Sequence, residues 1–300
     1  MKRYLLEHKN ATVPDMARHF SVSGQTIRRD FEVLESEGFL LRSYGGAILL
    51  ERKTNGVSNQ VKREMFVDEK QLICSRAVPF IRPNDCIYID HSTTALNLCS
   101  FIKNMPLTVV TNSLRVITEL ASSETVRVIS TSGRYYNEFE GFFGSETLSY
   151  LRQHCMDKAF LSCRSVDANR GPNDSDEVTA SVRQKAIENS DEVFMLVDHT
   201  KLDRSSFTTI CGFSDIDYFI TDRPLSDEWK QRLSEYDVTF RVAYHSKVPL
   251  RSNVPGPLSP LYPAKKNAGF AMRQLRRPLF LLPRRGCREK IKSFPHGKKL

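Results

Sequence analysis

The apolar positions at the start of the chain recur at helical spacing. Leu5 and Leu6 mark a short first helix. A second helix begins after Thr12, whose hydroxyl is suited to cap it, with Pro14 in its first turn. The apolar positions that share one face of this second helix are Val13, Met16, Ala17 and Phe20. The pattern therefore predicts two short helices that each bury one face.

A third helix is predicted from about Gly24 to Glu37, with Ser23 or Gly24 near its cap and Gly38 as the glycine that ends it. Its apolar stripe follows the spacing i, i+4, i+7 and consists of Ile27, Phe31 and Leu34. Two apolar triplets, 39–41 and 47–49, then flank a short polar turn and predict a β-hairpin. Residues 1–53 thus form a small helical unit closed by a hairpin.

From Asp68 to about Phe240 the pattern changes to short apolar runs that alternate with amphipathic stretches. The predicted strands are Cys86–Asp90, Leu107–Thr111, Val126–Ser130, Lys158–Cys163, Val193–Asp198, Ile216–Thr221 and Val238–Val242. The predicted helices include Lys70–Ile81, Thr93–Lys103, Leu114–Ser122, Ser145–Arg152, Ser175–Asn189 and Asp227–Glu235. Strands separated by helices indicate a doubly wound, mostly parallel sheet, so the fold class is α/β.

Four segments follow from these patterns. We expect a helical unit with a hairpin at 1–53, a polar linker at 54–67, an α/β domain at 68–245, and a tail at 246–300. The tail holds eight of the 14 prolines and shows no sustained period, so we expect it to be disordered. Three interpretations of it stay open: a basic arm that attracts phosphates, a segment without folded function, and an ending produced by an altered reading frame.

The net charge of +9 suggests that the protein binds nucleic acid, but the positive charge is not spread evenly along the chain. Residues 247–300 carry 14 basic residues and one acidic residue, or +13. Residues 1–53 carry nine basic and seven acidic residues, or +2, which leaves 54–246 at −6. The excess positive charge therefore belongs to the tail, and bulk charge does not identify a DNA-binding surface in the rest of the chain.

Composition excludes several classes of protein. With 40% hydrophobic and 26% charged residues, wholesale disorder is excluded. The N-terminus lacks a signal-peptide core, and no apolar run approaches the roughly 20 residues of a membrane helix. The seven cysteines form no CxxC pair, which favours reduced thiols over disulfides or a zinc site. We expect a soluble cytoplasmic protein with no membrane contact, no metal and no cofactor.

The third predicted helix presents polar side chains opposite its apolar stripe. Gln25, Thr26, Arg28 and Arg29 lie near its N-terminal half, where a recognition helix contacts the major groove. Arginine pairs with guanine, glutamine with adenine, and threonine contacts a thymine methyl or a phosphate. Arg42 and the hairpin tip, Tyr44, Gly45 and Gly46, are placed to contact the adjacent backbone or minor groove. The alternative is that the arginines only pair with Asp30 or Glu32 on a solvated helix.

A second candidate site follows the first strand of the α/β segment, at Asp90-His91-Ser92-Thr93-Thr94. Backbone N–H groups at a helix start, with nearby hydroxyls, favour an anion, and ligands of open α/β sheets bind at the carboxyl ends of strands. Asp90 is placed to accept hydrogen bonds from sugar hydroxyls. The alternative is an ordinary helix cap.

The N-terminal segment resembles the winged helix-turn-helix of DeoR-type bacterial transcription repressors. The resemblance lies in the run from Val22 to Asp30, in Leu34-Glu35-Ser36-Glu37-Gly38, and in Arg42-Ser43-Tyr44-Gly45-Gly46-Ala47. The family usually has a longer first helix, and here Met1 falls inside it.

Residues 68–243 are similar to the effector domain of the same family, which is related in fold to ribose-5-phosphate isomerase. The matching pieces are the Asp90–Thr94 motif, Val110–Ser113, Gly133, Asp157–Phe160, Gly171, Glu177, Asp198–Lys201 and Ile220–Asp222. Serines at 92, 132 and 165 replace glycines that are usual in the family. The resemblance implies a phosphorylated sugar or related metabolite as effector, bound by Asp90, Ser92, Thr93, Thr94, Asn112, Gly133 and Lys201.

Three functions follow from these features. The first is a transcription regulator, most simply a repressor of a carbohydrate-metabolism operon, which binds double-stranded operator DNA as a homodimer or homotetramer and responds to a sugar phosphate. The second is a sugar-phosphate isomerase-like enzyme fused to a DNA-binding module. The third is a general nucleic-acid binder that depends on the tail. No residue is assigned a catalytic role, because the histidines lack metal or catalytic spacing and fold likeness alone does not establish activity.

Overall fold

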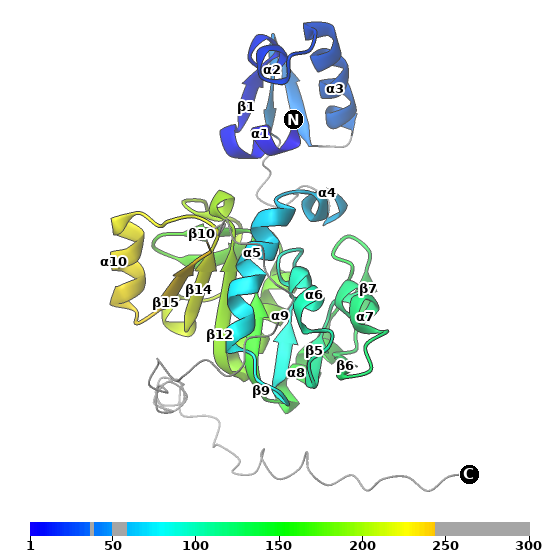
Figure 1. The fold of residues 1–300 in the computed structure, drawn as a ribbon, viewed down its shortest axis with the longest axis vertical. Helices are drawn as coiled ribbons and strands as arrows, with labels where there is room; N and C mark the ends of the chain where they lie inside the picture. Colours follow the sequence, from blue (N-terminus) through cyan, green and yellow to red (C-terminus); the bar gives the residue numbers. More distant parts are fainter. Residues whose placement is uncertain (37–38, 50–58, 244–300) are drawn as a thin grey trace, which may run out of the picture. The chain divides into compact units, whose positions relative to one another are not determined.

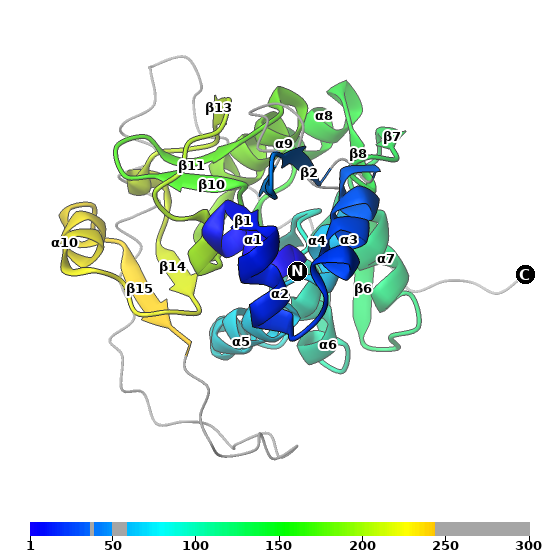
Figure 2. The same cartoon turned by 90° about the horizontal axis from the view of Figure 1, so that it is seen from above.

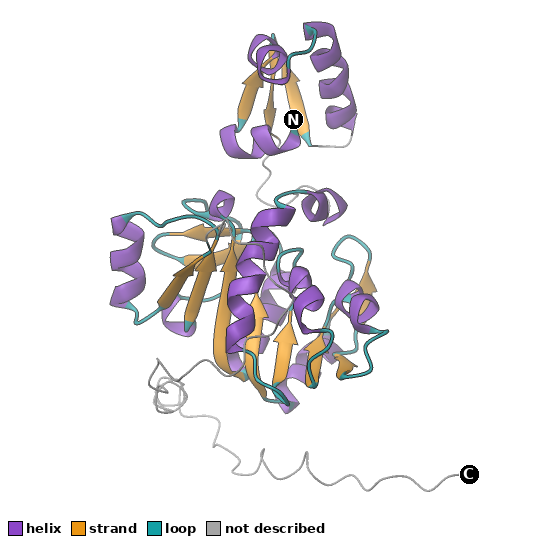
Figure 3. Ribbon diagram, viewed as in Figure 1, coloured by secondary structure: helices purple, strands orange, loops and turns teal. Residues whose placement is uncertain are grey.

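The computed structural model describes residues 1–36, 39–49 and 59–243 (Figure 1). Gly38, residues 54–58 of the predicted linker and the predicted tail at 246–300 lie outside the described residues. In the N-terminal unit the elements are α1 (Lys2–His8), β1 (Asn10–Thr12), α2 (Val13–Phe20), α3 (Gly24–Ser36), β2 (Leu40–Ser43) and β3 (Gly46–Leu49). Figure 3 shows these helices beside their small sheet. The unit has three helices and a hairpin, as the pattern predicts, and this is the winged helix-turn-helix that the resemblance implies.

Local capping explains where the helices of this unit begin. The Thr12 hydroxyl accepts a hydrogen bond from the Asp15 backbone N–H at 3.2 Å, as predicted for the start of α2. The Ser23 hydroxyl accepts from the Thr26 N–H at 3.1 Å at the start of α3. Apolar side chains from every element of the unit pack into one core, which includes Leu5, Met16, Ile27, Phe31 and Leu40. The sequence pattern did not predict β1, which pairs antiparallel with β3.

A seven-stranded sheet forms the centre of the α/β unit (Figure 1). Its strands are β4 (Cys86–Ile89), β5 (Leu107–Thr111), β6 (Val126–Ser130), β9 (Met156–Leu161), β12 (Ser190–Val197), β14 (Tyr218–Thr221) and β15 (Thr239–Val242). Their order is β15-β14-β12-β9-β4-β5-β6, and every pair is parallel. These are the seven predicted strands, which confirms the α/β fold class.

Helices cover both faces of this sheet, with α5 and α6 on one side and α8 and α9 on the other (Figure 2). Their bounds are α5 (Val67–Ala77), α6 (Cys99–Ile102), α7 (Leu114–Leu120), α8 (Ser145–Gln153), α9 (Glu177–Glu188) and α10 (Asp227–Glu235). Alternate strand residues point to opposite faces, so Ile87 and Ile89 join one core and Tyr88 joins the other. The sheet is therefore doubly wound, as predicted.

Several details differ from the predicted elements. The segment predicted as a helix at Thr93–Lys103 consists of a 3₁₀ turn, Ala95–Leu98, followed by the single turn α6. A two-stranded sheet, β7 (Arg134–Tyr136) with β8 (Gly141–Phe143), and a three-stranded sheet, β10 (Ser165–Asp167), β11 (Gly171–Asp174) and β13 (Thr208–Thr209), were not predicted. A helix, α4 (Asn59–Glu64), lies within the predicted polar linker. No helix in the described ranges is long and apolar enough to cross a membrane.

Candidate functional site

The strand order places the switch point of the sheet between β4 and β9. The chain passes from β4 to β5 and β6 in one direction, and then from β9 to β12, β14 and β15 in the other. The connections leave the sheet in opposite directions at this point, and open α/β sheets bind ligands in the resulting crevice. Asp90 directly follows β4, and its backbone N–H donates to the Phe160 carbonyl of β9 at 3.2 Å. The predicted motif therefore lies at the switch point.

Asp90 is fully buried and its carboxylate is already occupied. One oxygen accepts from the Ser92 N–H at 2.9 Å. The other accepts from the Ser162 N–H at 3.2 Å and from Nε of Arg183 on α9 at 2.7 Å. These three bonds tie Asp90 to the ends of β4 and β9 and to a buried arginine. Acceptance of hydrogen bonds from sugar hydroxyls by Asp90 stays a prediction.

Arg183 bridges two carboxylates in the interior. Only 4% of its side chain is exposed, and Nη1 lies 2.5 Å from Asp174 Oδ2. Burial alone would raise the pKa of Asp174, but the charge of Arg183 leads the contributions that keep that pKa below its ordinary value. Arg183 Nη2 also lies 3.4 Å from His91 Nε2. Because a guanidinium only donates, Nε2 is the acceptor and Nδ1 of His91 carries the proton.

Lys201 lies at the carboxyl end of β12 and contacts two of the neighbouring strand ends. Its ammonium donates to the Ser162 hydroxyl at 2.8 Å and to the Thr94 hydroxyl at 3.2 Å. It also pairs with Asp198 at 3.2 Å. Burial alone would lower the pKa of Lys201, but the attraction of Asp198, together with smaller contributions from Cys163 and Asp90, outweighs burial and raises it. The structure therefore brings together Thr94 and Lys201, two of the predicted effector-binding residues.

Two further lysines lie next to this cluster, and the sequence pattern did not identify them. Lys62 belongs to α4 and Lys70 to α5, and the Lys70 ammonium donates to the Lys62 carbonyl. Burial, followed by the charge of Arg164, lowers the pKa of Lys62 to about 8. Burial, followed by the charge of Lys201, lowers the pKa of Lys70 to about 8. Both lysines are therefore repelled by the cations of the same site.

Unpartnered buried polar atoms mark the same region. Among the described residues, the buried side-chain atoms without a hydrogen-bond partner are Glu69 Oε2, His91 Nδ1, Thr131 Oγ1 and His199 Nε2. His91, Thr131 and His199 follow the carboxyl ends of β4, β6 and β12. Buried polar groups are nearly always paired. Of these three residues His91 is the one that follows β4 at the switch point, whereas β12 and β6 lie two strands away from β4 on either side. His91 Nδ1–H is a donor that a polar ligand at the switch point would use.

Two other predicted effector-binding residues have structural roles here. Asn112 is fully buried, its carbonyl oxygen accepts from the Tyr88 hydroxyl at 2.8 Å, and its amide donates to the Phe142 carbonyl at 3.2 Å. These two bonds fix the orientation of the Asn112 side chain. Ser92 accepts from the Ala95 N–H at 3.1 Å, which is the capping role that the alternative interpretation predicts. Thr93 is half-buried beside Thr94.

Gly133 is required by packing. Its φ is +113°, and an added Cβ would lie 2.2 Å from Thr147 Oγ1 and 2.7 Å from the Phe143 carbonyl oxygen. We expect Gly133→Ala to destabilise the protein by about 3 kcal/mol, from backbone strain of about 1–3 kcal/mol and overpacking of about 1–3 kcal/mol. The free energy of unfolding in urea measures this loss.

Gly144→Ala is the matched control for that substitution. Gly144 has the same φ of +113°, but its added Cβ meets only the flexible end of Glu146, at 3.3 Å. We expect the control to lose only the strain component, so equal losses for the two variants would contradict a packing role for Gly133.

The predicted DNA-binding face of α3 is open. Gln25, Thr26, Arg28 and Arg29 are exposed, while the opposite stripe of the helix is buried. Within the described residues no ion pair engages Arg28 or Arg29. Glu32, one of the partners that the alternative interpretation gave them, instead pairs with Arg42 at 2.9 Å. The two arginines thus point their charge into solvent from the N-terminal half of α3.

The hairpin residues divide into two groups. Tyr44 at the tip is fully exposed, and Gly45 has a φ of +80° that suits the two-residue turn. Arg42 is bound to Glu35 at 2.7 Å as well as to Glu32, so it links the wing to α3. Gly46 is buried, and a Cβ there would lie 2.5 Å from the Ala11 carbonyl oxygen. Its role is close approach between β3 and β1.

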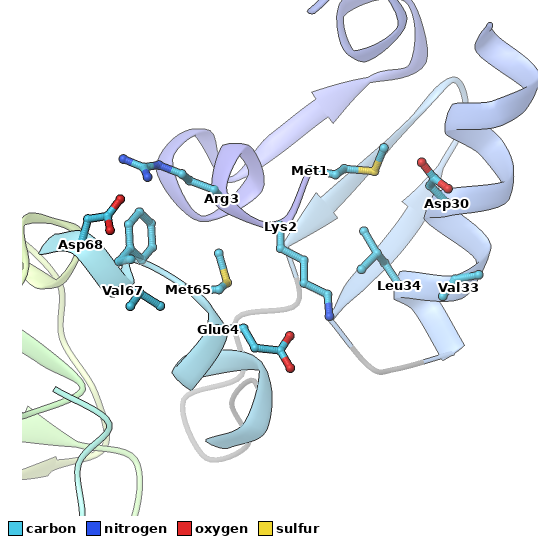
Figure 4. A pocket seen from close by; sticks show the side chains of 11 residues that line it. Met1, Lys2, Arg3, Asp30, Val33, Leu34, Glu64, Met65, Val67 and Asp68 are labelled. Carbon is cyan, nitrogen blue, oxygen red and sulfur yellow. The ribbon is translucent and has the colours of Figure 1, made fainter. Parts of the chain in front are cut away.

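Two cavities lie away from the switch-point site. One, of about 330 Å³, lies between α3 and the β2–β3 hairpin. It is lined by Val13, Arg28, Phe31, Glu35, Arg42, Ser43, Gly45 and Gly46. The other, of about 570 Å³, is shown in Figure 4 and is lined by residues 1–3, Asp30, Val33, Leu34 and 64–68. Neither cavity contains a predicted effector-binding residue. In the part of the chain that the structure describes, no group of three His, Cys, Asp or Glu side chains is arranged to bind a metal.

An exposed recognition helix with a wing, joined to an α/β domain with a polar site at its switch point, defines a DNA-binding transcription regulator with a sensor domain. Comparison with known families agrees. Residues 1–53 match the DeoR-like helix-turn-helix domain, and residues 65–223 match the DeoR C-terminal sensor domain. The chain belongs to the DeoR family.

Individual relatives cover most of the chain. It is 34% identical over 235 residues to an uncharacterised HTH-type transcriptional regulator, YulB, of Bacillus subtilis, covering 78% of this chain and 91% of the relative. It is 29% identical to the L-fucose operon activator of Haemophilus influenzae, covering 79% of this chain and 95% of the relative. It is also 29% identical to the glycerol-3-phosphate regulon repressor of Escherichia coli, covering 76% of this chain and 90% of the relative. Among solved structures, ribose 5-phosphate isomerase A of Methanocaldococcus jannaschii is similar at 15% identity and a TM-score of 0.35, covering 45% of this chain and 54% of that one.

Proposed function

We propose that this regulator represses a carbohydrate-metabolism operon and that a phosphorylated sugar or related metabolite controls its binding to operator DNA. The observation that carries the effector class is the charge at the switch point. The carboxylates are Asp90, Asp174 and Asp198, and the cations are Lys62, Lys70, Arg164, Arg183 and Lys201. Glu69, which also faces Lys70, is ion-paired with Arg3.

Apart from Arg164, four cations face three carboxylates, which leaves an excess of one positive charge in a mostly buried site. Burying charge without a counter-ion is unfavourable, so the site favours an anion. A phosphate monoester carries about −1.5 to −2 at pH 7. We assign Thr94, Lys201 and His91 as its direct contacts and Asp90, Asn112 and Arg183 as positioning residues.

The names of the relatives support a carbohydrate pathway. They include an L-fucose operon activator, a lactose phosphotransferase system repressor, a putative aga operon repressor and the glycerol-3-phosphate regulon repressor. Repressors are the more frequent among these, which favours repression here. We infer a homodimer or homotetramer, because a single winged helix buries too little surface for operator specificity and two half-sites require two copies.

The test measures DNA binding and ligand binding on the full-length protein. We expect its own promoter fragment to bind at least about a thousandfold more tightly than random DNA at physiological salt. Thermal shift is then measured with ribose 5-phosphate, glucose 6-phosphate, fructose 1-phosphate, glycerol 3-phosphate and inorganic phosphate, beside the unphosphorylated parent compounds. At least one phosphorylated compound is expected to stabilise the protein and to weaken promoter binding. Equal affinity for promoter and random DNA, or stabilisation by the unphosphorylated compounds alone, would contradict the proposal.

A further inference from the structure

Arg42, on strand β2 of the hairpin, is bound to the recognition helix α3 through two carboxylates. One oxygen of Glu35 accepts from the Arg42 backbone N–H at 2.9 Å, and the other oxygen accepts from Nε at 2.7 Å. Nη1 of the same arginine donates to Glu32 at 2.9 Å. Three hydrogen bonds thus join one residue of the hairpin to α3, and they engage its main chain as well as its side chain.

The backbone bond also satisfies the free edge of the small sheet. The strand order is β1-β3-β2, so β2 is an edge strand. The outward N–H groups of an edge strand have no neighbouring strand to pair with. Glu35 supplies the acceptor for the N–H of Arg42, and this bond leads the contributions that lower the pKa of Glu35. Glu35 therefore sets the separation of the hairpin from α3.

The two carboxylates lie on the same face of α3 as a predicted base-contacting residue. Arg28, Glu32 and Glu35 follow one another at i, i+4 and i+7, which places them on one side of the helix. Arg28, Glu35 and Arg42 also line the cavity between α3 and the hairpin. Carboxylates beside bound DNA are repelled by its phosphates. Two of them on a recognition helix therefore reduce DNA affinity unless they serve another purpose.

We propose that this purpose is to hold the hairpin in place, and that Arg42 serves DNA binding through Glu32 and Glu35 and not by touching DNA. Arg42 is then a positioning residue. The hairpin tip, Tyr44 and Gly45, follows it by two residues, so the three bonds determine where the tip meets the DNA backbone. Backbone contacts fix the register in which a recognition helix meets the bases, so the bonds of Arg42 support selectivity. This role belongs to DNA binding alone and does not depend on the proposed effector.

Replacing both Glu32 and Glu35 with alanine is the main test, because a positioning role and direct contact predict opposite results. The double substitution removes two negative charges from α3 and frees the arginine, so an Arg42 that contacts DNA would then bind the promoter more tightly. In the positioning role, the ratio of promoter affinity to random-DNA affinity should fall at least about tenfold. Fluorescence anisotropy on the full-length protein, without any sugar phosphate, measures both affinities. A ratio equal to or above that of the wild type would overturn the proposal.

Arg42→Met completes a double-mutant cycle with this variant. Alone it should lower the ratio, but in the Glu32→Ala, Glu35→Ala background it should cause less than about a further twofold loss. An equal loss in both backgrounds would mean that Arg42 contacts DNA itself. Arg115→Met is the matched control, since Arg115 is 48% exposed against 43% for Arg42 and is bound to Glu140 at 2.6 Å in the sensor domain. It should keep the wild-type ratio, and a loss as large as that of Arg42→Met would contradict the proposal.

The salt dependence of binding is a readout that a change in stability does not imitate. Each phosphate contact contributes about 0.9 to the slope of log affinity against log salt concentration. In the alanine background, Arg42→Met should therefore leave the slope for random DNA unchanged, whereas a slope reduced by about one would reveal a phosphate contact and overturn the proposal. The side chains of Arg42, Glu32 and Glu35 are 43%, 62% and 34% exposed, so no variant leaves a buried charge. Thermal denaturation verifies that each variant is folded.

Discussion

Replacing Arg183 with methionine is expected to reduce the free energy of unfolding by about 3–5 kcal/mol, the loss typical when one partner of a buried ion pair is removed. Arg183 is 4% exposed and bonds Asp90 at 2.7 Å and Asp174 at 2.5 Å. Without the guanidinium both carboxylates stay in the interior with no cation in direct contact. Urea denaturation of the full-length protein measures the change. A loss below about 1 kcal/mol would contradict the central role given to this arginine.

Two comparisons separate this effect from ordinary loss of a surface charge. Lys230→Met removes the exposed pair with Asp227 and should change stability by less than about 0.5 kcal/mol. Asp90→Asn in the Arg183→Met background should restore part of the loss, because it removes one of the stranded charges. Double-mutant analysis of these two positions then gives their coupling energy.

The ion pairs of Arg183 also determine how the free energy of unfolding changes with pH. Because the pKa of Asp174 is lowered in the folded wild type, its stabilising contribution is present at neutral pH and is lost as pH falls. In Arg183→Met the buried carboxylates take up protons more readily, so the variant gains relative stability as pH falls. The difference in unfolding free energy between wild type and variant should therefore shrink from pH 7 towards pH 4.

The sheet was predictable because each of its strands is a compact apolar run between polar turns. β5 and β6 have the predicted bounds, and the other five differ by a few residues at their ends. The short strands β7, β8, β10, β11 and β13 have two to four residues each, too few for an alternating pattern to emerge. The predicted helix after Thr93 begins as a 3₁₀ turn because the Ser92 hydroxyl and the Thr94 carbonyl bond backbone N–H groups three residues later.

The site was predictable only in part, because its chemistry depends on partners that are distant in sequence. Thr94 and Lys201 were found from local motifs, and the structure joins them across 107 positions. Arg183 is 93 positions from Asp90 and lies in a helix where an arginine is ordinarily solvated, so nothing local marks it as buried. The helix α4 was missed for a related reason, since a run of polar residues predicts a linker. Asn112 and Gly133 were predicted as effector-binding residues; the structure shows only their internal contacts, so this role stays a prediction.

Replacing both Arg28 and Arg29 with alanine is expected to abolish selective promoter binding while the protein stays folded. Each arginine that reads a base contributes about 1–3 kcal/mol, which corresponds to roughly 5- to 150-fold in affinity. Both side chains are exposed on α3 and no ion pair within the described residues engages them, so their removal leaves no buried group without a partner. Fluorescence anisotropy with the promoter fragment and with random DNA of equal length measures the effect.

The two single variants then distinguish reading of a base from attraction to a phosphate. A base contact should weaken promoter binding more than random binding, whereas a phosphate contact should weaken both equally and reduce the salt slope by about one. Arg18→Ala is the matched control, since Arg18 is 79% exposed on α2 and is paired with Asp15. If the Arg18 variant loses as much affinity as the α3 variants, the effect is bulk charge, and α3 is not the recognition helix. Residues 1–53 carry only +2, so specific placement on α3 is the property that this comparison isolates.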